Sequence, residues 1–235
     1  MSSRKIILFL LSLAISYTPA YSAVASSEKI MLIHGFLGAS WNLHYHEYLL
    51  KQAHLNPISW DYPSREKTIQ MHAEELVKYL QEEANEHPCR PIHFLTHSMG
   101  GLVLRAAINH PNCPVEAKSG RAVLLVPPNQ GSIWGRKLGE WKVICALCQN
   151  QSGRELLTQE NFNYLGEFPG TMQIKIIAGN ESLNPFISAA NDGIVTVNET
   201  LLHTPHEHTT IAEEHHFILI SQLANQLILE FFLRP

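Results

Sequence analysis

Six short, uninterrupted apolar runs alternate with longer amphipathic stretches, and this alternation limits the fold more than any other feature of the sequence. The runs are Ile30–Ile33, Ile58–Trp60, Ile92–Leu95, Ala122–Val126, Ile174–Ile177 and a weaker one near Thr209–Ile211. Strands without polar alternation suit a sheet that is buried on both faces. The pattern therefore predicts an α/β fold, with a mostly parallel sheet of about six strands and helices on both faces.

Helical periodicity fills the intervals between these runs. One stripe consists of Ile69, Ala73, Leu76, Val77 and Leu80, with charged residues on the opposite side. A second helix is expected directly after Thr96. In the last helix, the predicted buried stripe consists of Phe217, Ile220, Leu223, Leu227 and Phe231. Apolar residues at this spacing are typical of helix faces that pack on a core, so we expect no chemistry from them.

One interval is much longer than an ordinary connection. Roughly 45 residues separate Val126 from the next strand, which is expected to begin near Met172. The interval contains apolar residues at helical spacing, namely Trp134, Leu138, Trp141, Ile144 and Cys148. Two interpretations stay open: a cap or lid at about residues 132–170, or an ordinary crossover helix with a long loop.

The first 25 residues have the layout of a secretory signal. Arg4 and Lys5 precede an apolar run from Ile6 to Ile15, and the small residues of 23–25 offer a cleavage site before Ser26. A cleavage site after Ser22 and an uncleaved N-terminal anchor are the alternatives. We expect an exported protein, periplasmic or secreted, whose single domain occupies residues 26–235.

Charge and cysteine content narrow the possible partners. The formal net charge is −4 without long runs of one sign, so the sequence has no basic footprint for nucleic acid. Export permits disulfides, and Cys89–Cys113 is a plausible bridge because both residues are expected at the same end of the sheet. Cys145 and Cys148 lie within a helical pattern, where a bridge between them would be strained.

A serine stands at the junction of a predicted strand and a predicted helix. Thr96-His97-Ser98-Met99-Gly100 occupies the place of a G-x-S-x-G nucleophile elbow, a sharp turn that exposes the serine hydroxyl above a sheet. Thr96 replaces the first glycine, and a small side chain is still sterically credible there. A serine before a helix is otherwise a common N-cap. The strand before it and Gly100-Gly101 after it favour Ser98 as a nucleophile.

The loop after the first strand contains two glycines. His34-Gly35-Phe36-Leu37-Gly38 can direct backbone N–H groups into a site at the end of the sheet. Such donors stabilise the oxyanion that forms when a nucleophile attacks an acyl carbon. We predict that the N–H groups of Phe36 and Met99 form this oxyanion hole. His34 precedes the nucleophile, so it is expected to order the loop.

An acid and a base should follow the nucleophile in that order. Asp192, in Asn191-Asp192-Gly193, follows a predicted strand, although Asp-Gly also makes ordinary turns. Asp61 and Glu181 are the rival acids, and Asp61 violates the chain order. His215 and His216 both lie between the last strand and the last helix, where the base is expected.

The histidines also allow a metal hypothesis. His206 and His208, with His215 or His216, offer imidazoles that suit zinc. The spacing matches no helical H-E-x-x-H motif, and no acidic partner completes it. We therefore predict no metal.

From about Lys29 to Phe232, the chain resembles the bacterial lipase/esterase branch of the α/β-hydrolase superfamily. The resemblance rests on six motifs in the same order, which are residues 34–36, 61–65, 96–101, 127–132, 191–193 and 215–219. In similar proteins the last motif reads His-Thr-Phe-Ile, and its first histidine is catalytic. The resemblance thus implies His215 as the base, with His216 in the threonine position.

The resemblance implies hydrolysis of carboxylic esters through an acyl-enzyme on Ser98, with Asp192 and His215 completing a triad and no cofactor. Thioesterases, phospholipases and acyltransferases share these motifs, and a non-catalytic lipid- or partner-binding protein is a further alternative. The expected partner is a small ester or lipid, with possible transient contact with a membrane or lipid surface. Trp134 and Trp141 are candidates for the wall that meets an acyl chain.

Overall fold

The computed structural model describes residues 27–141, 151–182 and 184–234, and these residues build one six-stranded sheet. The strands are β1 (Lys29–Ile33), β2 (Asn56–Trp60), β3 (Ile92–His97), β4 (Arg121–Leu125), β5 (Gln173–Gly179) and β6 (Glu207–Ile211). Their order across the sheet is β2-β1-β3-β4-β5-β6, and every neighbouring pair is parallel. The predicted α/β class and all six predicted strands are confirmed.

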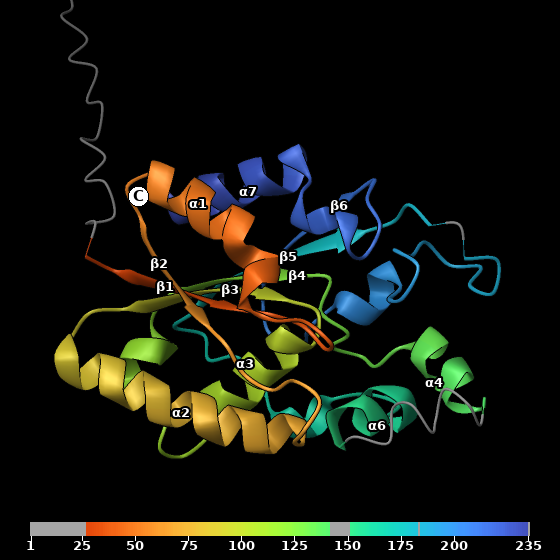
Figure 1. Ribbon diagram of the computed structural model, residues 1–235, viewed down its shortest axis with the longest axis horizontal. Coiled ribbons are helices and arrows are strands. Elements are labelled where there is room, and N and C mark those ends of the chain that lie inside the picture. The colour runs from red at the N-terminus through yellow and green to blue at the C-terminus, as the bar shows by residue number, and fades with distance from the viewer. Residues whose placement is uncertain (1–26, 142–150, 183, 235) are drawn as a thin grey trace, which may run out of the picture.

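Four helices cover the sheet, two on each face. Helices α1 (His44–Gln52) and α7 (Gln222–Phe232) lie above it in Figure 1, and α2 (Ile69–Glu86) and α3 (Met99–Asn109) lie below it. The shorter described elements are α4 (Ile133–Gly139), α6 (Gln151–Thr158), η1 (Ser40–Leu43), η2 (Val115–Lys118), η3 (Asn163–Leu165), η4 (Val197–Thr200) and η5 (Phe217–Leu219). None of the described helices has the length and apolarity required to cross a bilayer.

Strand β1 shows why the sheet needs cover on both faces. Ile30 and Leu32 pack in the core with α1 and α7, whereas Met31 and Ile33 pack in the core with α2 and α3. Successive side chains of a strand point to opposite faces, so a run of four buried apolar residues contributes to both layers.

Helix α2 follows its predicted pattern. Thr68 caps its first turn, because its hydroxyl accepts a hydrogen bond from the Met71 N–H at 3.1 Å. All five residues of the predicted stripe are buried. The prediction for this helix is confirmed.

The predicted stripe of the last helix is only partly right. Phe217, Ile220 and Leu223 are exposed, whereas Leu227 packs partly buried against the core and Phe231 is buried, as predicted. The chain first makes the short helix η5, and Ser221 then caps a new helix through the Ala224 N–H. This restart changes the helical phase, so residues before and after Ser221 do not share one face.

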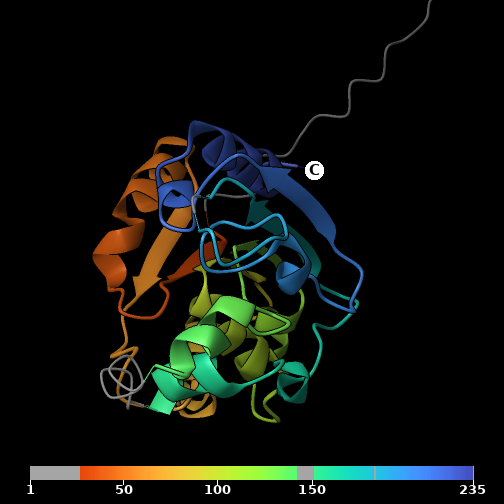
Figure 2. The same cartoon turned by 90° about the vertical axis from the view of Figure 1, so that its right-hand side faces the viewer.

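The loops that follow β1, β3, β5 and β6 all leave from the same edge of the sheet. Neighbouring parallel strands end on one side, and here that side is the carboxyl edge, which faces the viewer in Figure 2. In open α/β sheets this edge is where ligands bind. The predicted site residues all lie on these loops or at the start of α3.

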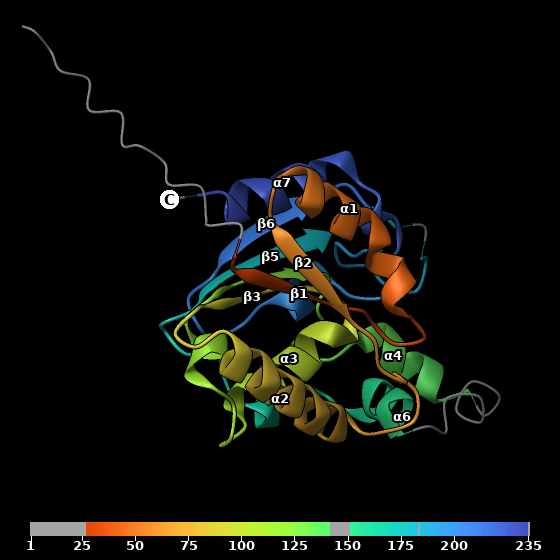
Figure 3. The ribbon, with the colours of Figure 1, turned by 60° about the vertical axis from the view of Figure 1, so that its left-hand side comes forward.

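The long interval between β4 and β5 contains two short helices beside this edge. We call the described residues 132–141 and 151–170 the cap segment. Its helices α4 and α6 lie side by side (Figures 1 and 3). They approach closely because Gly135 and Gly139 have no side chains: a Cβ at Gly135 would lie 2.7 Å from the Leu156 carbonyl oxygen, and one at Gly139 would lie 2.9 Å from that of Leu157.

The proposed Cys89–Cys113 bridge is absent, and both thiols are free. Cys89 is exposed in a turn with a φ of 63°, whereas the Cys113 sulfur is buried beside the Pro114 carbonyl. The two residues do return to one end of the sheet, but their side chains are in different environments. The predicted signal segment (1–25), Ile144, Cys145 and Cys148 lie outside the described residues.

Candidate active site

Ser98 occupies a sharp turn between β3 and α3. Its φ of 51° and ψ of −123° lie outside the conformations that L-residues ordinarily adopt. The turn brings α3 against the end of β1: a Cβ at Gly100 would lie 2.5 Å from the Ile33 carbonyl oxygen and 2.7 Å from that of His34. Only glycine fits this position, so the sequence permits a strained turn here.

Thr96 shows how a residue other than glycine is accommodated two positions before Ser98. Its side chain is fully buried, and its hydroxyl lies 3.3 Å from the position that a Cβ on Gly101 would take. The hydroxyl has no hydrogen-bond partner among the described residues. Gly101 has no side chain, and the Thr96 side chain occupies the space that this leaves.

The loop after β1 lies against the serine. A Cβ at Gly35 would lie 3.0 Å from the Ser98 Cβ. The loop then turns through Leu37, which has a φ of 60°, and the Gly38 N–H donates to the Gly35 carbonyl at 3.1 Å. Phe36 sits within this turn and lines the same cavity as Ser98. The predicted oxyanion donors Phe36 and Met99 are thus placed on the two segments that flank the serine.

His34 orders this loop and takes no part in the contacts of the serine. Its ring is fully buried and stacks on Tyr62, with ring centroids 4.3 Å apart. The Tyr62 hydroxyl donates to the His34 carbonyl at 2.8 Å, and Asp61 Oδ1 lies 3.3 Å from His34 Nε2. Burial lowers the pKa of His34 despite this carboxylate. The segment that follows β2 thereby supports the loop after β1.

His215 and Asp192 complete a chain of contacts with the serine. His215 Nε2 lies 3.0 Å from Ser98 Oγ, and His215 Nδ1 lies 2.7 Å from Asp192 Oδ2. A carboxylate only accepts, so Nδ1 carries the hydrogen and Nε2 is free to accept from the serine hydroxyl. Asp192 and His215 are almost fully buried, which excludes water from competing for this contact.

The Asp192 carboxylate is fixed by the turn in which it lies. Its Oδ1 accepts from the N–H groups of Ile194 at 2.9 Å and Val195 at 2.7 Å, which leaves Oδ2 for the histidine. Gly193 has a φ of 100°, a conformation that favours glycine. Asp-Gly here therefore makes a turn, and the same turn places the Asp192 carboxylate against His215.

The rival residues lie elsewhere. The His216 ring lies beside that of His215 with centroids 5.3 Å apart, at the mouth of the cavity. Asp61 contacts the loop after β1, and Glu181 is exposed after β5. His206 and His208 lie near Thr204 and Thr200, and no metal-binding group of three or more acidic, histidine or cysteine side chains occurs within the described residues.

An apolar cavity of about 290 Å³ opens beside Ser98. Its walls come from both sides of the site: Phe36, Ile194 and Val195 from the loops, and Trp134, Leu138, Leu156 and Leu157 from the cap segment. Trp134 stacks on Phe186 with ring centroids 5.3 Å apart. Trp141, the other predicted wall residue, is 55% exposed and does not line the cavity. A second groove of about 460 Å³ is lined by residues 37–39 and 61–66 and does not contain Ser98.

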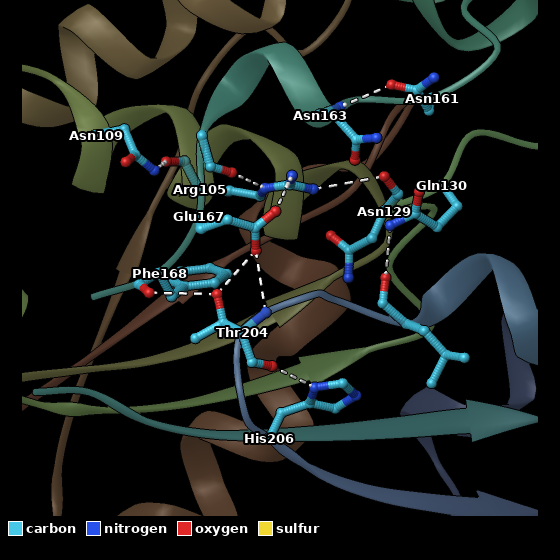
Figure 4. A network of polar contacts seen from close by, with 12 residues as sticks. Arg105, Asn109, Asn129, Gln130, Asn161, Asn163, Glu167, Phe168, Thr204 and His206 are labelled. Carbon is cyan, nitrogen blue, oxygen red and sulfur yellow. Dashed lines mark hydrogen bonds and ion pairs between the residues drawn. The ribbon is translucent and has the colours of Figure 1, made fainter. Parts of the chain in front are cut away.

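A buried arginine links the elbow to the base of the cap segment, and sequence reasoning missed it. Arg105 on α3 donates to the Gly166 carbonyl and pairs with Glu167 at 3.2 Å, and Glu167 in turn accepts from the Thr204 hydroxyl at 2.8 Å (Figure 4). Asn129 continues the network by donating to the Thr200 carbonyl at 2.7 Å. A charged residue in an otherwise apolar helix stretch, Leu102–Ile108, was the available signal.

The fold and the arrangement of strands, elbow and loops define the class: this is an α/β-hydrolase fold. Solved structures with similar folds include the mature lipase BlEst2 of Bacillus licheniformis, with a TM-score of 0.70 and 19% identity over 87% of this chain and 91% of that one. A lipase-esterase related protein of Clostridium acetobutylicum has a TM-score of 0.60 and 12% identity over 88% and 96%. Phospholipase PlaB of Legionella pneumophila has a TM-score of 0.57 and 18% identity over 74% and 44%.

With identities of 12–19%, these structural similarities show the fold alone. No protein-family model and no curated protein sequence matches it.

Proposed function

We propose that this protein is a serine hydrolase that cleaves carboxylic esters through an acyl-enzyme on Ser98. One observation carries the proposal: a serine on a strained turn, a histidine and a carboxylate form an unbroken series of contacts of 3.0 and 2.7 Å beside an apolar cavity. This is the geometry that activates a hydroxyl as a nucleophile.

In the proposed reaction, Ser98 Oγ forms a bond to the acyl carbon and its proton passes to His215 Nε2. Asp192 accepts a hydrogen bond from Nδ1–H and stabilises the imidazolium. The carbonyl oxygen becomes an oxyanion, which accepts hydrogen bonds from the N–H groups of Phe36 and Met99. The ester C–O bond then breaks, and His215 returns the proton to the departing alcohol.

Water completes the cycle. His215 takes a proton from a water molecule as its oxygen attacks the acyl-enzyme, and the acid leaves as the proton returns to Ser98. No cofactor enters these steps. An alcohol in place of water would give acyl transfer, so analysis of the products separates hydrolysis from transfer.

The cavity favours an ester with a small to medium apolar acyl group. Its volume of about 290 Å³ is at the lower end of the roughly 300–1,000 Å³ that ligand pockets usually have. Its walls are mainly apolar, and the cap segment closes one side. The N-terminal signal pattern supports the proposal that the enzyme acts after export, on small esters or lipids outside the cytoplasm.

The test compares wild type with Ser98→Ala on p-nitrophenyl esters. We expect a loss in kcat of about 10³-fold or more, because the nucleophile is gone while the binding cavity remains. A fluorophosphonate probe should label wild type and fail to label the variant. Ser119→Ala is the control, since Ser119 is exposed, its hydroxyl donates to the Glu116 carbonyl, and it does not line the cavity. Equal turnover by wild type and Ser98→Ala would disprove the proposal.

A further inference from the structure

A second histidine touches the site from the nucleophile's own strand. His97 is the last residue of β3 and directly precedes Ser98, and its ring is nearly fully buried. Its Nε2 lies 3.0 Å from the carbonyl oxygen of His215. A carbonyl only accepts hydrogen bonds, so His97 Nε2 carries a hydrogen and donates it.

This contact holds the backbone of His215 on its second side. The His215 N–H already donates to the Asp192 carbonyl at 2.9 Å. The backbone nitrogen of His215 is thus fixed by the loop that carries Asp192, and its carbonyl oxygen is fixed by His97. The second link joins the backbone of His215 to the side chain next to Ser98 in the chain, across 118 residues of sequence.

The other ring nitrogen faces the loop that carries Phe36. A Cβ at Gly35 would lie 3.1 Å from His97 Nδ1, so a side chain there would press on the ring. The imidazole of His97 therefore stands between the loop after β1 and the loop that carries His215.

The ring is also suited to stand beside a histidine that becomes charged. Burial keeps the pKa of His97 well below its usual value, and the neighbouring His215 and His216 lower it further. The centroids of the His97 and His215 rings are 5.1 Å apart. A neutral donor fixes the His215 carbonyl without placing a second positive charge beside the imidazolium that forms during the reaction.

We propose that His97 is a positioning residue, which holds the His215 ring in line with Ser98 through its hydrogen bond to the His215 carbonyl. The inference rests on the proposed function, because its effect is on the rate of acylation. His97 itself makes no bond to the substrate in this scheme. Its loss should therefore lower kcat and leave the binding of substrate largely unchanged.

Three substitutions separate the hydrogen bond from simple packing. His97→Leu removes the donor, His97→Asn keeps an amide that is too short to reach the carbonyl, and His97→Gln carries an amide nitrogen near the position of Nε2. We expect kcat on p-nitrophenyl butyrate to fall about 10- to 100-fold for the Leu and Asn variants, with KM within about 2-fold of wild type. The Gln variant should recover kcat to within about 3-fold.

His93 provides a matched control on the same strand. It is 6% exposed, as His97 is, but lies at the opposite end of β3, where it contacts Glu28 at 2.9 Å and accepts from the Arg121 N–H at 2.9 Å. His93→Leu should reduce the midpoint of urea unfolding and leave kcat within about 2-fold of wild type. If both histidines had only a structural role, both substitutions would lower stability alone. The positioning role predicts that His97→Leu lowers kcat as well and that His93→Leu does not.

The rate of Ser98 modification by a fluorophosphonate gives a second readout without an ester. It should fall in parallel with kcat for the Leu and Asn variants and recover in the Gln variant. The proposal is overturned if His97→Leu or His97→Asn keeps wild-type kcat, or if Gln and Asn are equally impaired. If wild type itself neither hydrolyses esters nor reacts with the probe, the proposed function has failed instead.

Discussion

The carboxyl edge of the sheet and the cap segment line the same cavity, but different forces hold them in place. At the edge, backbone hydrogen bonds continue the sheet up to the reacting atoms: the Ser98 N–H donates to Leu125 at 2.8 Å, and the Val126 N–H donates to Ile177 at 2.9 Å. The cap segment meets the rest of the molecule mainly through side chains, such as the Ser152 hydroxyl on the Ser64 carbonyl at 2.6 Å. Among its described backbone N–H groups, only that of Phe162 donates to a backbone carbonyl outside it, that of Asn129 at 3.4 Å.

This difference suggests a division of roles. Backbone ladders fix atoms in geometries that side-chain changes elsewhere do not disturb, and a rate depends steeply on such geometry. Side-chain contacts between a cap and a core can be rearranged at small cost. We expect changes at the carboxyl edge to alter kcat, and changes in the cap segment to alter which esters bind.

The largest effect is expected at the acid. Asp192→Asn should lower kcat about 10³- to 10⁴-fold, because an amide can donate to His215 and stabilise the wrong tautomer. Steady-state kinetics on p-nitrophenyl butyrate measure this loss. Glu181→Gln, at the rival acid, should remain within about 2-fold of wild type. Similar losses in both variants would contradict the assignment of Asp192.

A methyl group at the elbow should have the next largest effect. In Gly100→Ala the new Cβ would lie 2.5 Å from the Ile33 carbonyl oxygen, so α3 must move away from the loop after β1. We expect kcat to fall about 10²-fold, since this movement separates Met99 from Phe36. Gly170→Ala is the control, because a Cβ there meets nothing within 4 Å. Unchanged kcat in Gly100→Ala would count against a rigid elbow.

Acid should destabilise the packing of α1 on the sheet through a buried histidine, a residue type that the cap segment lacks. Residues 132–170 contain no histidine, whereas α1 buries His46, whose ring nitrogens have no partner among the described residues. Burial lowers the pKa of His46 from 6.5 to about 4. Between these values only the unfolded chain binds this proton, so the stability of the folded state falls as the pH decreases through this window.

The size of this effect follows from the two pKa values. When the pH decreases from about 7.5 to about 5, the unfolding free energy of wild type should fall by about 2 kcal/mol more than that of His46→Leu. Urea unfolding at both pH values measures it, with the exposed His203→Asn as control. The same pH dependence in wild type and His46→Leu would show that His46 does not contribute.

The smallest effect is expected within the cap segment. Gly135→Ala creates a contact of 2.7 Å with the Leu156 carbonyl oxygen, nearly as close as the contact at the elbow. Here α4 can shift from α6, so we expect kcat/KM to fall about 5- to 10-fold for p-nitrophenyl hexanoate and less than about 2-fold for p-nitrophenyl acetate. Equal losses on both esters would contradict the division of roles between the two regions.

The sheet was predictable because its strands are buried on both faces. An uninterrupted apolar run such as Ala122–Val126 leaves few alternatives when amphipathic stretches surround it. The first part of the stripe in the last helix was predicted wrongly, because the capping hydroxyl of Ser221 ends one helical turn and begins another. Periodicity alone does not register such a restart when apolar residues continue on both sides of it.

Residues of the site differ in how far the sequence could indicate them. Ser98 was singled out by local steric demands, and chain order limited the acid and the base; their catalytic roles stay predictions for the experiments above. His97 gave no comparable signal, and Arg105 gave only that of a charge within an apolar helix. The partner of His97, the His215 carbonyl, is 118 residues away, and a contact with a backbone carbonyl requires no particular residue type. The partners of Arg105, Gly166 and Glu167, are 61 and 62 residues away.

The sequence by itself determined the class of the fold and the place of the strained turn, because buried strands and a glycine that touches a carbonyl restrict the residue types that fit. Only the tertiary structure decided which of the neighbouring histidines meets Ser98, that Cys89 and Cys113 stay apart, and which cap residues line the cavity. These outcomes depend on distances between segments far apart in the chain. Patterns of spacing and residue type within one segment do not fix such distances.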